Sequence, residues 1–529
     1  MNRRHVISIV LNIHQPFVRY CESSHPPEER CFFDLLSDTC LPLLEIFDRL
    51  DADHIPFRMA LVFSPVLCHM LKDEFLLQRY LEHVDRQIDF GARELERTAA
   101  DPRLQSLAKL FYDRAVDKRI LFTERYGRDV LAVFDYYQKK GRLELLGTAA
   151  TYAFLPFYTA YPEAVQAQIE VAVASHRLFF GRNPQGFWLP ELGWSPELDA
   201  YLRSYSFSYT IVDTHSLILR DPPASRGSFY PVKTPSNVFI LARDYYAQRD
   251  IEDPETGFPL DPLYRDYNRD AGYELPLEVV RPFLGSNGER TQTGYKYWAG
   301  QNKGDAMYDP LRASEKAREQ ARSFLDARIK RLLAAGQYME ESAISLCAYN
   351  ADSFGRTWYE GPQFIEALFR EACKREEIRF MNPLEYLYKQ NAASLQTMTP
   401  EFSSWGPNGY AEMWLDASND WLYRHAIRSL ERMIELAERF PGDSGLKERA
   451  LNQAAREILL VQSADWPGML YKQEFPEFVR SRIESSLRNF TTIYESLGSN
   501  YISTEWLTNL ERQHNIFPGI NYRVFRRKH

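Results

Sequence analysis

Short apolar runs alternate with longer amphipathic stretches through the first three-quarters of the chain. The apolar runs, which predict buried strands, are His5–Asn12, Phe57–Phe63, Leu143–Leu146, Gly186–Leu189, Ser208–Val212, Asn237–Leu241 and Ala343–Ala348. Helical spacing of apolar residues marks Phe32–Leu50, Glu163–Phe179, Ser314–Ala335 and Pro362–Lys374. Strands that alternate with helices in this way are typical of a parallel α/β sheet or barrel.

Three segments depart from this alternation. Residues from about 72 to 128 are highly charged and helical throughout, which predicts an inserted helical hairpin. After about residue 400 the strands stop, and a C-terminal helical region is expected at Trp421–Phe440, Gly445–Gln462, Glu474–Leu497 and Thr504–His514. The stretch from Pro222 to Asp270 is rich in Pro, Asp and Tyr and predicts a long irregular loop, a kind of segment that is usually functional.

Polar side chains stand directly after several of the predicted strands. They are His14, Ser64, Glu191, Asp213 and Asn350. In parallel barrels, active residues lie just past the carboxyl ends of the strands. These five positions are therefore the first candidates for chemistry.

Composition narrows the possible partners and the compartment. The chain has 529 residues, 45% of them hydrophobic, which is enough for two or three domains with a large core. The net charge of −8 comes from mixed signs without a basic block, which argues against nucleic acid as a partner. No apolar run reaches membrane-spanning length, and the first one is too short for a signal peptide, so no membrane contact is expected.

The cysteines indicate a reducing compartment. Cys21, Cys31, Cys40, Cys68, Cys347 and Cys373 form no CxxC pair, and no histidine cluster has zinc spacing. We therefore expect free thiols, no metal and a cytoplasmic location.

The stretch Gly186-Phe-Trp-Leu-Pro-Glu-Leu-Gly-Trp194 carries the clearest chemical signal. Glu191 lies between Trp188 and Trp194, just beyond a predicted strand. Aromatic rings stack on the apolar faces of sugar rings, and a carboxylate can attack or stabilise an anomeric carbon. The pattern predicts a sugar site, with a surface or helix-capping role for Glu191 as the plainer alternative.

Further motifs follow in order along the chain. The first part contains His14-Gln-Pro; Leu143-Glu-Leu-Leu-Gly with Ala153-Phe-Leu-Pro156; Gly186-Phe-Trp-Leu-Pro-Glu191; Val212-Asp-Thr-His215; and Phe354-Gly with Trp358-Tyr-Glu-Gly361. The C-terminal region adds Ser403-Ser-Trp-Gly, Asn419-Asp-Trp-Leu-Tyr-Arg-His425, Gln462-Ser-Ala-Asp-Trp466 and Ile516-Phe-Pro-Gly-Ile-Asn-Tyr522. Together these motifs resemble glycoside hydrolase family 57, and within it the 1,4-α-glucan branching enzymes.

The resemblance implies a fold and a reaction. It implies an incomplete (β/α)7 barrel at 1–71 and 129–395, an inserted helical subdomain at 72–128 and a C-terminal all-helical domain at 396–529 that completes a glucan groove. It also implies a retaining mechanism without metal or cofactor, in which one carboxylate attacks and a second acts as acid and then as base. A branching enzyme passes the glucan to a 6-hydroxyl instead of water. The implied partner is an α-glucan such as amylose, glycogen or a malto-oligosaccharide, and the oligomeric state is left open.

The same resemblance implies roles for single residues. Glu191 corresponds to the nucleophile, His14 to a sugar contact, and Asp213 and His215 to an orienting or substrate-contacting pair. Further substrate contacts are implied for Tyr152, Trp188, Trp358, Trp405, Trp414, Gln462 and Asp465. A structural role is the alternative for the isolated His14, and packing alone could explain each tryptophan, because tryptophan is commonly buried.

One catalytic position departs from the family pattern. The family has Asp-Ala-Glu where this chain has Asn350-Ala-Asp352, so the acid/base aspartate becomes Asn350. An amide can neither protonate a glycosidic oxygen nor take a proton from an acceptor hydroxyl. Asp352 is a possible substitute acid. If the strand continues, however, it lies about 6.6 Å from Asn350 on the same face, whereas retaining carboxyl pairs are about 5–5.5 Å apart.

Other departures surround the same position. The family's His-Trp after Phe-Gly is Arg356-Thr357 here, its histidine before Ala-Phe-Leu-Pro is Tyr152, and the first histidine of its His-x-His is Asn12. The long loop lacks the family's tyrosine that favours transfer over hydrolysis, and Tyr230 stands one position away from its place. Changes that cluster at one subsite indicate natural divergence of the cleavage site rather than of the groove.

Three functional hypotheses follow. The first is an active glucan branching enzyme or related α-glucanotransferase with Glu191 as nucleophile and an unconventional acid. The second is a catalytically inactive homologue that binds α-glucan as a sensor or scaffold. The third is an enzyme for another glycoside, whose leaving group needs no acid.

Overall fold

A curled sheet of mainly parallel strands forms the centre of the computed structural model, which describes residues 4–20, 28–285, 288–300, 306–499 and 501–528. The strand order is β6-β7-β5-β4-β3-β2-β1-β8. The parallel strands are β1 His5–Ile13, β2 Met59–Phe63, β3 Leu143–Thr148, β4 Gly186–Trp188, β5 Tyr209–Val212, β7 Phe239–Ala242 and β8 Ile344–Asn350. A parallel bridge between Arg243 and Leu346 brings the two edges together, which gives an incomplete (β/α)7 barrel.

Two short strands extend this sheet. β6 (Val232–Lys233) is antiparallel to β7, and β9 (Ile378–Phe380) pairs in parallel with β1. β1 pairs with β2 and β8 and is buried along its whole length. A strand of a parallel sheet that is covered on both faces needs a continuous apolar sequence, which explains the long apolar run near the N-terminus.

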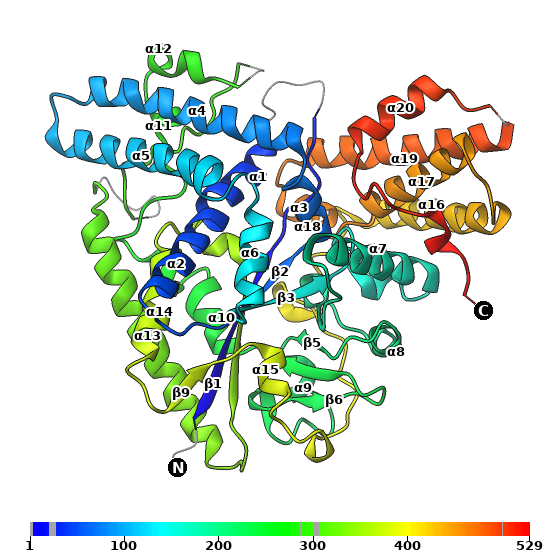
Figure 1. Cartoon of the computed structure of the whole chain (residues 1–529), viewed down its shortest axis with the longest axis horizontal. Helices are drawn as coiled ribbons and strands as arrows, with labels where there is room; N and C mark the ends of the chain where they lie inside the picture. The colour runs from blue at the N-terminus through cyan, green and yellow to red at the C-terminus, as the bar shows by residue number, and fades with distance from the viewer. Residues whose placement is uncertain (1–3, 21–27, 286–287, 301–305, 500, 529) are drawn as a thin grey trace.

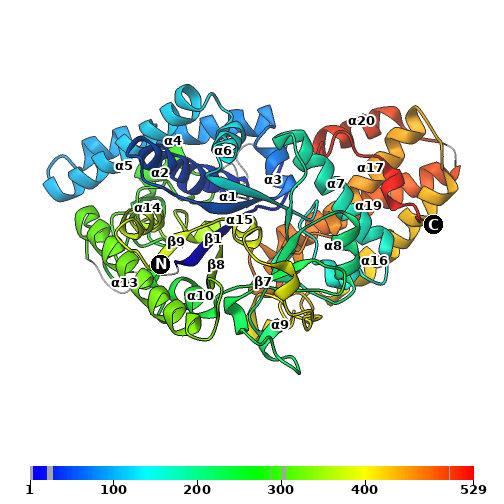
Figure 2. The same cartoon turned by 60° about the horizontal axis from the view of Figure 1, so that its bottom comes forward.

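Helices cover the outside of the barrel (Figures 1 and 2). They are α1 Glu29–Asp34, α2 Leu41–Ala52, α3 Pro65–Met70, α6 Val130–Lys139, α7 Pro162–Phe180, α8 Leu198–Ser204, α9 His215–Ile218, α10 Tyr245–Glu252, α13 Pro310–Gly336, α14 Gly361–Ala372 and α15 Pro383–Leu387. The short helices α11 (Ala271–Glu274) and α12 (Leu277–Val280) lie instead beside the helical pair described next. Asp309 caps α13 by accepting hydrogen bonds from the backbone N–H groups of Leu311 and Arg312, which fixes where this long helix begins.

Two further groups of helices flank the barrel. α4 (Glu74–Arg97) and α5 (Pro102–Ile120) lie side by side at one end in Figure 1, and Asp73 and Asp101 cap their first turns. The C-terminal helices, orange to red in Figure 1, are α16 Asp420–Arg439, α17 Leu446–Val461, α18 Asp465–Lys472, α19 Pro476–Ser499 and α20 Thr504–Gln513. Within the described ranges, no helix combines the length and the apolar character that crossing a bilayer demands.

Most predicted elements are confirmed, with ends that differ by a few residues, but one interpretation is wrong. The stretch from Pro222 to Asp270 is less irregular than expected, because it contains β6 and α10 in addition to β7, the strand predicted at Asn237–Leu241. The helical stretch expected at Phe32–Leu50 is confirmed, and its backbone passes from α1 through a π-helical turn at Leu35–Cys40 into α2. The exact boundaries of the three regions stay a prediction.

Candidate active site

The turn after β4 holds Glu191 in an unusual backbone conformation. Glu191 has φ 57° and ψ 25°, and Leu192 has φ 50°. A side-chain-bearing residue rarely adopts this left-handed region, and such strain persists where the surroundings impose it, often at functional sites. Here the Trp405 backbone N–H donates to the Glu191 carbonyl oxygen at 2.6 Å, and Leu192 N–H donates to the Leu189 carbonyl at 2.9 Å. The strand-end position predicted for Glu191 is therefore fixed by two backbone hydrogen bonds.

The surroundings of Glu191 disfavour its charged form. Burial, and after it the negative charge of Asp465, raise the pKa of the Glu191 carboxyl group to about 8. Lys472 acts in the opposite direction and Glu252 in the same direction, each with a smaller effect. A carboxyl group whose pKa is perturbed by burial and by named neighbouring charges is a candidate functional group.

Tyr152 connects the residues around Glu191. Its hydroxyl oxygen accepts hydrogen bonds from Asn12 Nδ2 at 2.8 Å, from Trp188 Nε1 at 3.2 Å and, at the limit of 3.5 Å, from the Glu191 backbone N–H. Its ring stacks on the imidazole of His14, with the ring centroids 3.9 Å apart. Tyr152 is buried and has φ 59°, so its position is fixed by the backbone as well as by these contacts.

His14 links the barrel to the C-terminal helices. Its Nδ1 lies 2.7 Å from Ser64 Oγ, and its Nε2 lies 2.8 Å from Oδ2 of Asp465 at the start of α18. Ser463 donates a further hydrogen bond to the same Asp465 oxygen at 2.5 Å. The structure thus brings together His14, Tyr152, Asp465 and the Glu191 turn from four separate parts of the sequence.

Asn350 and Asp352 lie beside this group but do not offer a free carboxyl group. Asn350 is the last residue of β8, and its Oδ1 accepts a hydrogen bond from Asn12 Nδ2 at 3.0 Å. Asp352 Oδ2 is engaged by Arg356 Nη1 at 2.5 Å and by Gln15 Nε2 at 3.2 Å. The assumption that the strand continues past Asn350 is wrong, because the chain turns into a 3-10 helix at Ala351–Ser353.

Glu252, which the sequence did not single out, is a second buried carboxyl group near this position. It ends α10, and its Oε2 lies 3.6 Å from Arg243 Nη1 without a hydrogen-bond partner in the described part of the chain. Burial raises its pKa to about 7, against the effects of Arg243, Gln248 and the backbone amide of Asn350. The contact with the backbone amide of Asn350 places Glu252 next to the end of β8.

Asp213, His215 and Arg243 form a charged cluster at the edge of a groove. Arg243 Nη2 pairs with Asp213, and His215 Nδ1 lies 3.5 Å from the other Asp213 oxygen. Burial alone would raise the pKa of Asp213, but the charge of Arg243 and the hydrogen bond with His215 hold it below its ordinary value. The Arg243 guanidinium stacks over Trp405 at 4.5 Å.

The groove beside this cluster has a volume of about 700 Å³. Asp213, His215, Arg243 and Trp405 line it, which agrees with a shared location for three residues that the sequence singled out. The sequence did not point to the exposed aromatic side chains that also line the groove, namely Tyr245, Tyr246 and Tyr410. Exposed aromatic rings beside hydrogen-bonding groups are suited to bind sugar rings.

Four other predicted contact residues are buried. Trp188, Trp358, Trp414 and Gln462 are each at most 2% exposed. Trp358 packs against Tyr264, Phe354 and Phe364, and Trp414 stacks on Phe154 at 5.4 Å. Gln462 Oε1 accepts a hydrogen bond from Gln168. In this structure these four side chains pack against other residues, and sugar contact by them stays a prediction.

The described residues contain no group of three or more His, Cys, Asp or Glu side chains that could hold a metal ion. The cysteines Cys31, Cys40, Cys68, Cys347 and Cys373 are free thiols, and Cys21 lies outside the described residues.

The chain is similar to known protein families and to single characterised proteins. Residues 8–271 match the family model described as glycosyl hydrolase family 57, and residues 425–525 match the one described as 1,4-α-glucan branching enzyme, C-terminal. A 1,4-α-glucan branching enzyme of Thermococcus kodakarensis is 25% identical, over 93% of this chain and 73% of that protein.

Solved structures with the same fold extend over the whole chain. The α-amylase AmyC of Thermotoga maritima is similar with a TM-score of 0.93 and 32% identity, over 99% of this chain and 100% of that one. A family 57 branching enzyme of Pyrococcus horikoshii is similar with a TM-score of 0.89 and 23% identity, over 99% and 97%. At 23% identity, the similarity to the Pyrococcus horikoshii enzyme shows only a shared fold.

Proposed function

The chain belongs to glycosyl hydrolase family 57, and on this basis we propose that it is a retaining α-glucan transferase of the branching type, with Glu191 as its nucleophile. Its substrate would be amylose, glycogen or a malto-oligosaccharide. The observation that carries the proposal is the turn at Glu191, which Trp405 and Tyr152 hold at the strand end. Strained backbone of this kind is typical of a residue that must present a reactive group in one orientation.

The proposed reaction has two steps. In the first, the ionised Glu191 carboxylate attacks C1 of an α-1,4-linked glucosyl unit, the C1–O4 bond breaks, and the leaving O4 takes a proton from an acid. A glycosyl ester of Glu191 results. In the second, the 6-hydroxyl of another glucan chain attacks C1, gives its proton to the group that acted as acid, and releases Glu191. The product carries an α-1,6 branch with retained configuration.

We assign the acid–base role to Glu252 in place of Asn350. A buried carboxyl group with an unpartnered oxygen, next to the Asn350 backbone amide, is available for proton transfer. Because its pKa is raised to about 7, a large share of Glu252 is protonated at neutral pH, and it can also take a proton back. Asp352 fits this role less well, because Arg356 and Gln15 already engage its oxygen.

Incubation with amylose tests the proposal when α-1,6 branch points and new reducing ends are measured together. We expect the wild type to form branch points and Glu191→Gln to form none. New reducing ends without branch points would refute branching and indicate hydrolysis, the reaction of an α-amylase such as the one from Thermotoga maritima.

The role of Glu252 has its own test. Glu252→Gln should lose at least a hundredfold in turnover of amylose, because general acid help is worth about 10²–10⁴ in rate. It should keep most of its activity on α-maltosyl fluoride, since fluoride leaves without a proton. Glu255→Gln, which changes an exposed glutamate close by, is the matched control. Equal losses on both substrates would remove Glu252 from the acid role and leave the role of Glu191 standing.

Glucan binding without turnover is the second candidate, favoured by the amide at Asn350 and the engaged carboxylate of Asp352. Calorimetry with maltoheptaose separates it from the first. Binding by the wild type without branch points, new reducing ends or fluoride release would support the second candidate. Absence of binding would count against both.

A further inference from the structure

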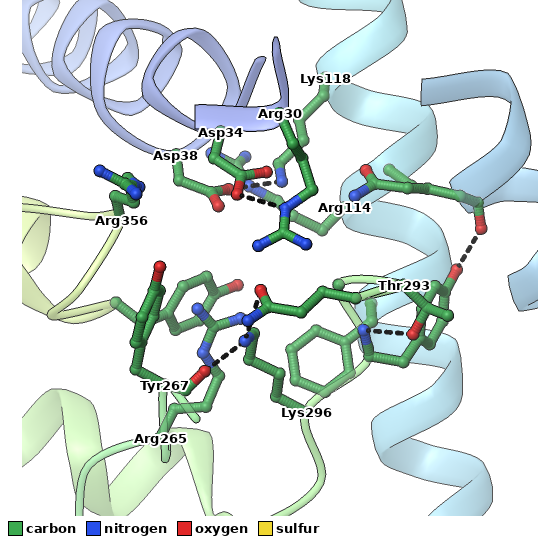
Figure 3. Close-up of a pocket in the computed structure, with 17 residues that line it drawn as sticks. Arg30, Asp34, Asp38, Arg114, Lys118, Arg265, Tyr267, Thr293, Lys296 and Arg356 are labelled. Carbon is green, nitrogen blue, oxygen red and sulfur yellow. Dashed lines mark hydrogen bonds and ion pairs between the residues drawn. The ribbon is translucent and has the colours of Figure 1, made fainter. Parts of the chain in front are cut away.

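A second cavity lies between α1, α5 and the segment from Arg265 to Lys296 (Figure 3). Its volume is about 30 Å³, against about 700 Å³ for the groove. The cationic side chains that line it are Arg30, Arg114, Lys118, Arg265, Lys296 and Arg356. In Figure 3 Arg30 points into the cavity from one side, and Arg265 and Lys296 reach in from the other.

Four of these six cations have close carboxylate partners. Arg30 pairs with Asp34 at 3.1 Å, Lys118 with Asp38 at 2.6 Å, Arg114 with Glu45, and Arg356 with Asp352 at 2.5 Å. Two of these carboxylates, Asp34 and Asp38, line the cavity themselves. The cations with the weakest neutralisation are Arg265 and Lys296.

Arg265 is a buried guanidinium that is neutralised only in part. It is 5% exposed and stacks on the Tyr359 ring at 4.0 Å, and its Nε has no hydrogen-bond partner in the described part of the chain. The neighbouring Glu360 accepts a hydrogen bond from the Arg265 backbone N–H at 3.2 Å, and burial raises the pKa of Glu360 to about 7. Glu360 therefore neutralises Arg265 only in part, and a buried charge without a full partner is costly.

Lys296 is the second under-neutralised cation. It is 4% exposed, and its Nζ donates to the Tyr267 carbonyl and, at 3.2 Å, to Gln292 Oε1. Its carboxylate partner, Asp270, is 3.9 Å away. Burial lowers the pKa of Lys296 to about 8, so its positive charge is disfavoured where it stands. An anion in the cavity would stabilise both cations at once.

We propose that this cavity binds a phosphate-sized oxyanion through Arg265, Lys296 and Arg30. Guanidinium groups match the geometry of phosphate oxygens, and ammonium groups bind them as point charges. The small volume suits a group of a few heavy atoms rather than a sugar ring. The occupant is therefore inorganic phosphate or the phosphoryl group of a metabolite whose remainder stays at the mouth.

The same cavity is linked to the catalytic region by one ion pair. Arg356 lines the cavity and holds Asp352, two residues beyond Asn350. An anion that attracts Arg356 would weaken its hold on Asp352. If the proposed function is correct, glucan and anion then affect each other's binding, because coupling between two sites is reciprocal. Anion binding itself does not depend on that function.

Calorimetry at constant ionic strength, in a buffer without phosphate, tests the proposal. We expect one equivalent of inorganic phosphate to bind to the wild type. Arg265→Met and Lys296→Met should each weaken it at least tenfold, and Arg322→Gln, which removes an exposed cation, should change it less than twofold. Glucose 1-phosphate is the second ligand. If glucose 1-phosphate binds more tightly than inorganic phosphate, the occupant is the phosphoryl group of a metabolite. If inorganic phosphate binds more tightly, the occupant is the free ion.

Hydrogen exchange on the wild type locates the anion without a variant. Phosphate should slow exchange in residues 264–268 and 292–298, and protection confined to other segments would overturn the proposal. No phosphate binding at 10 mM, or an equal response to potassium chloride, would overturn it as well. So would unchanged binding in both folded methionine variants.

Discussion

Replacing Glu191 by glutamine should stabilise the protein, and by more as the pH rises. Burial is the main reason that the pKa of Glu191 is raised to about 8, from an ordinary value of 4.5. Between these values the unfolded chain releases a proton that the folded protein keeps. The contribution of Glu191 to stability is therefore fully present below about pH 4.5 and is lost as the pH rises through about 8. Glutamine does not ionise and avoids this loss.

The size of the effect follows from the shift. Each pH unit inside this window costs the wild type about 1.4 kcal/mol, so the step from pH 5 to pH 8 costs at most about 4 kcal/mol. Because the Glu191 side chain is partly open to solvent, we expect about 2–3 kcal/mol. The unfolding entropy of a chain of this length is about 1 kcal/mol per K. The advantage of Glu191→Gln in Tm should therefore be about 2–3 °C larger at pH 8 than at pH 5.

Thermal unfolding at pH 5, 6.5 and 8, at constant ionic strength, measures this difference. Glu255→Gln removes an exposed carboxylate and should show the same small difference from the wild type at every pH. A Glu191→Gln advantage that stays flat, or that shrinks toward pH 8, would refute the reasoning. It would mean that the Glu191 carboxylate is stabilised by its surroundings, which contradicts a site that disfavours its charge.

Four further predictions concern turnover and the hydrogen-bond network. The branching rate plotted against pH should be bell-shaped, with limbs near pH 7 and pH 8, because Glu191 must be ionised while Glu252 is protonated. A rate that keeps rising to pH 10 would exclude Glu252 as the acid. Asp465→Asn should move this profile to lower pH, since it removes a negative charge that raises the pKa of Glu191; an unmoved profile would contradict that coupling. Because Glu252 already supplies the acid, Asn350→Asp should change the branching rate on amylose by less than about tenfold, whereas a gain of about 10²-fold or more would show that an acid was missing and would count against Glu252. Tyr152→Phe should lower the free energy of unfolding by about 1–3 kcal/mol in urea titrations, because it leaves buried donors unpaired; a loss below 0.5 kcal/mol would show that the donors find other partners.

The barrel could be predicted because its signal is local. A strand covered on both faces must be apolar along its length, and β1 shows this directly in its sequence. β6 and β9 are only two or three residues long and owe their place to pairing with β7 and β1. Nothing within so short a segment distinguishes it from a loop, and the eight-residue helix α10 was missed as well, so the stretch from Pro222 to Asp270 was expected to be irregular.

In the candidate site, too, residues with a local sequence signal could be predicted, and residues placed by tertiary contacts could not. Glu191, His14 and Asn350 follow strands, and the rule that active residues lie at strand ends finds them without a structure. The geometry of Asp352 could not be predicted, because whether a strand continues or turns depends on its tertiary contacts. Glu252 gave no signal at all, since a glutamate that ends an amphipathic helix is usually solvated.

Glu252 is buried because α10 packs against the barrel. This burial helps to decide between glucan turnover and glucan binding alone. α10 lies against β8, where the Tyr349 hydroxyl donates to the Ala247 carbonyl at 2.9 Å, so the end of the helix points its glutamate at the last residue of β8. Burial raises the pKa of both groups; the charge of Glu252 adds a small increase at Glu191, and that of Asp213 adds one at Glu252. A protein that only bound neutral glucan would be more stable with amides at both places, as Asn350 illustrates. Two carboxyl groups with raised pKa values, one in the turn after β4 and one at the end of α10, are what proton transfer and nucleophilic attack require. This argument favours turnover over binding alone.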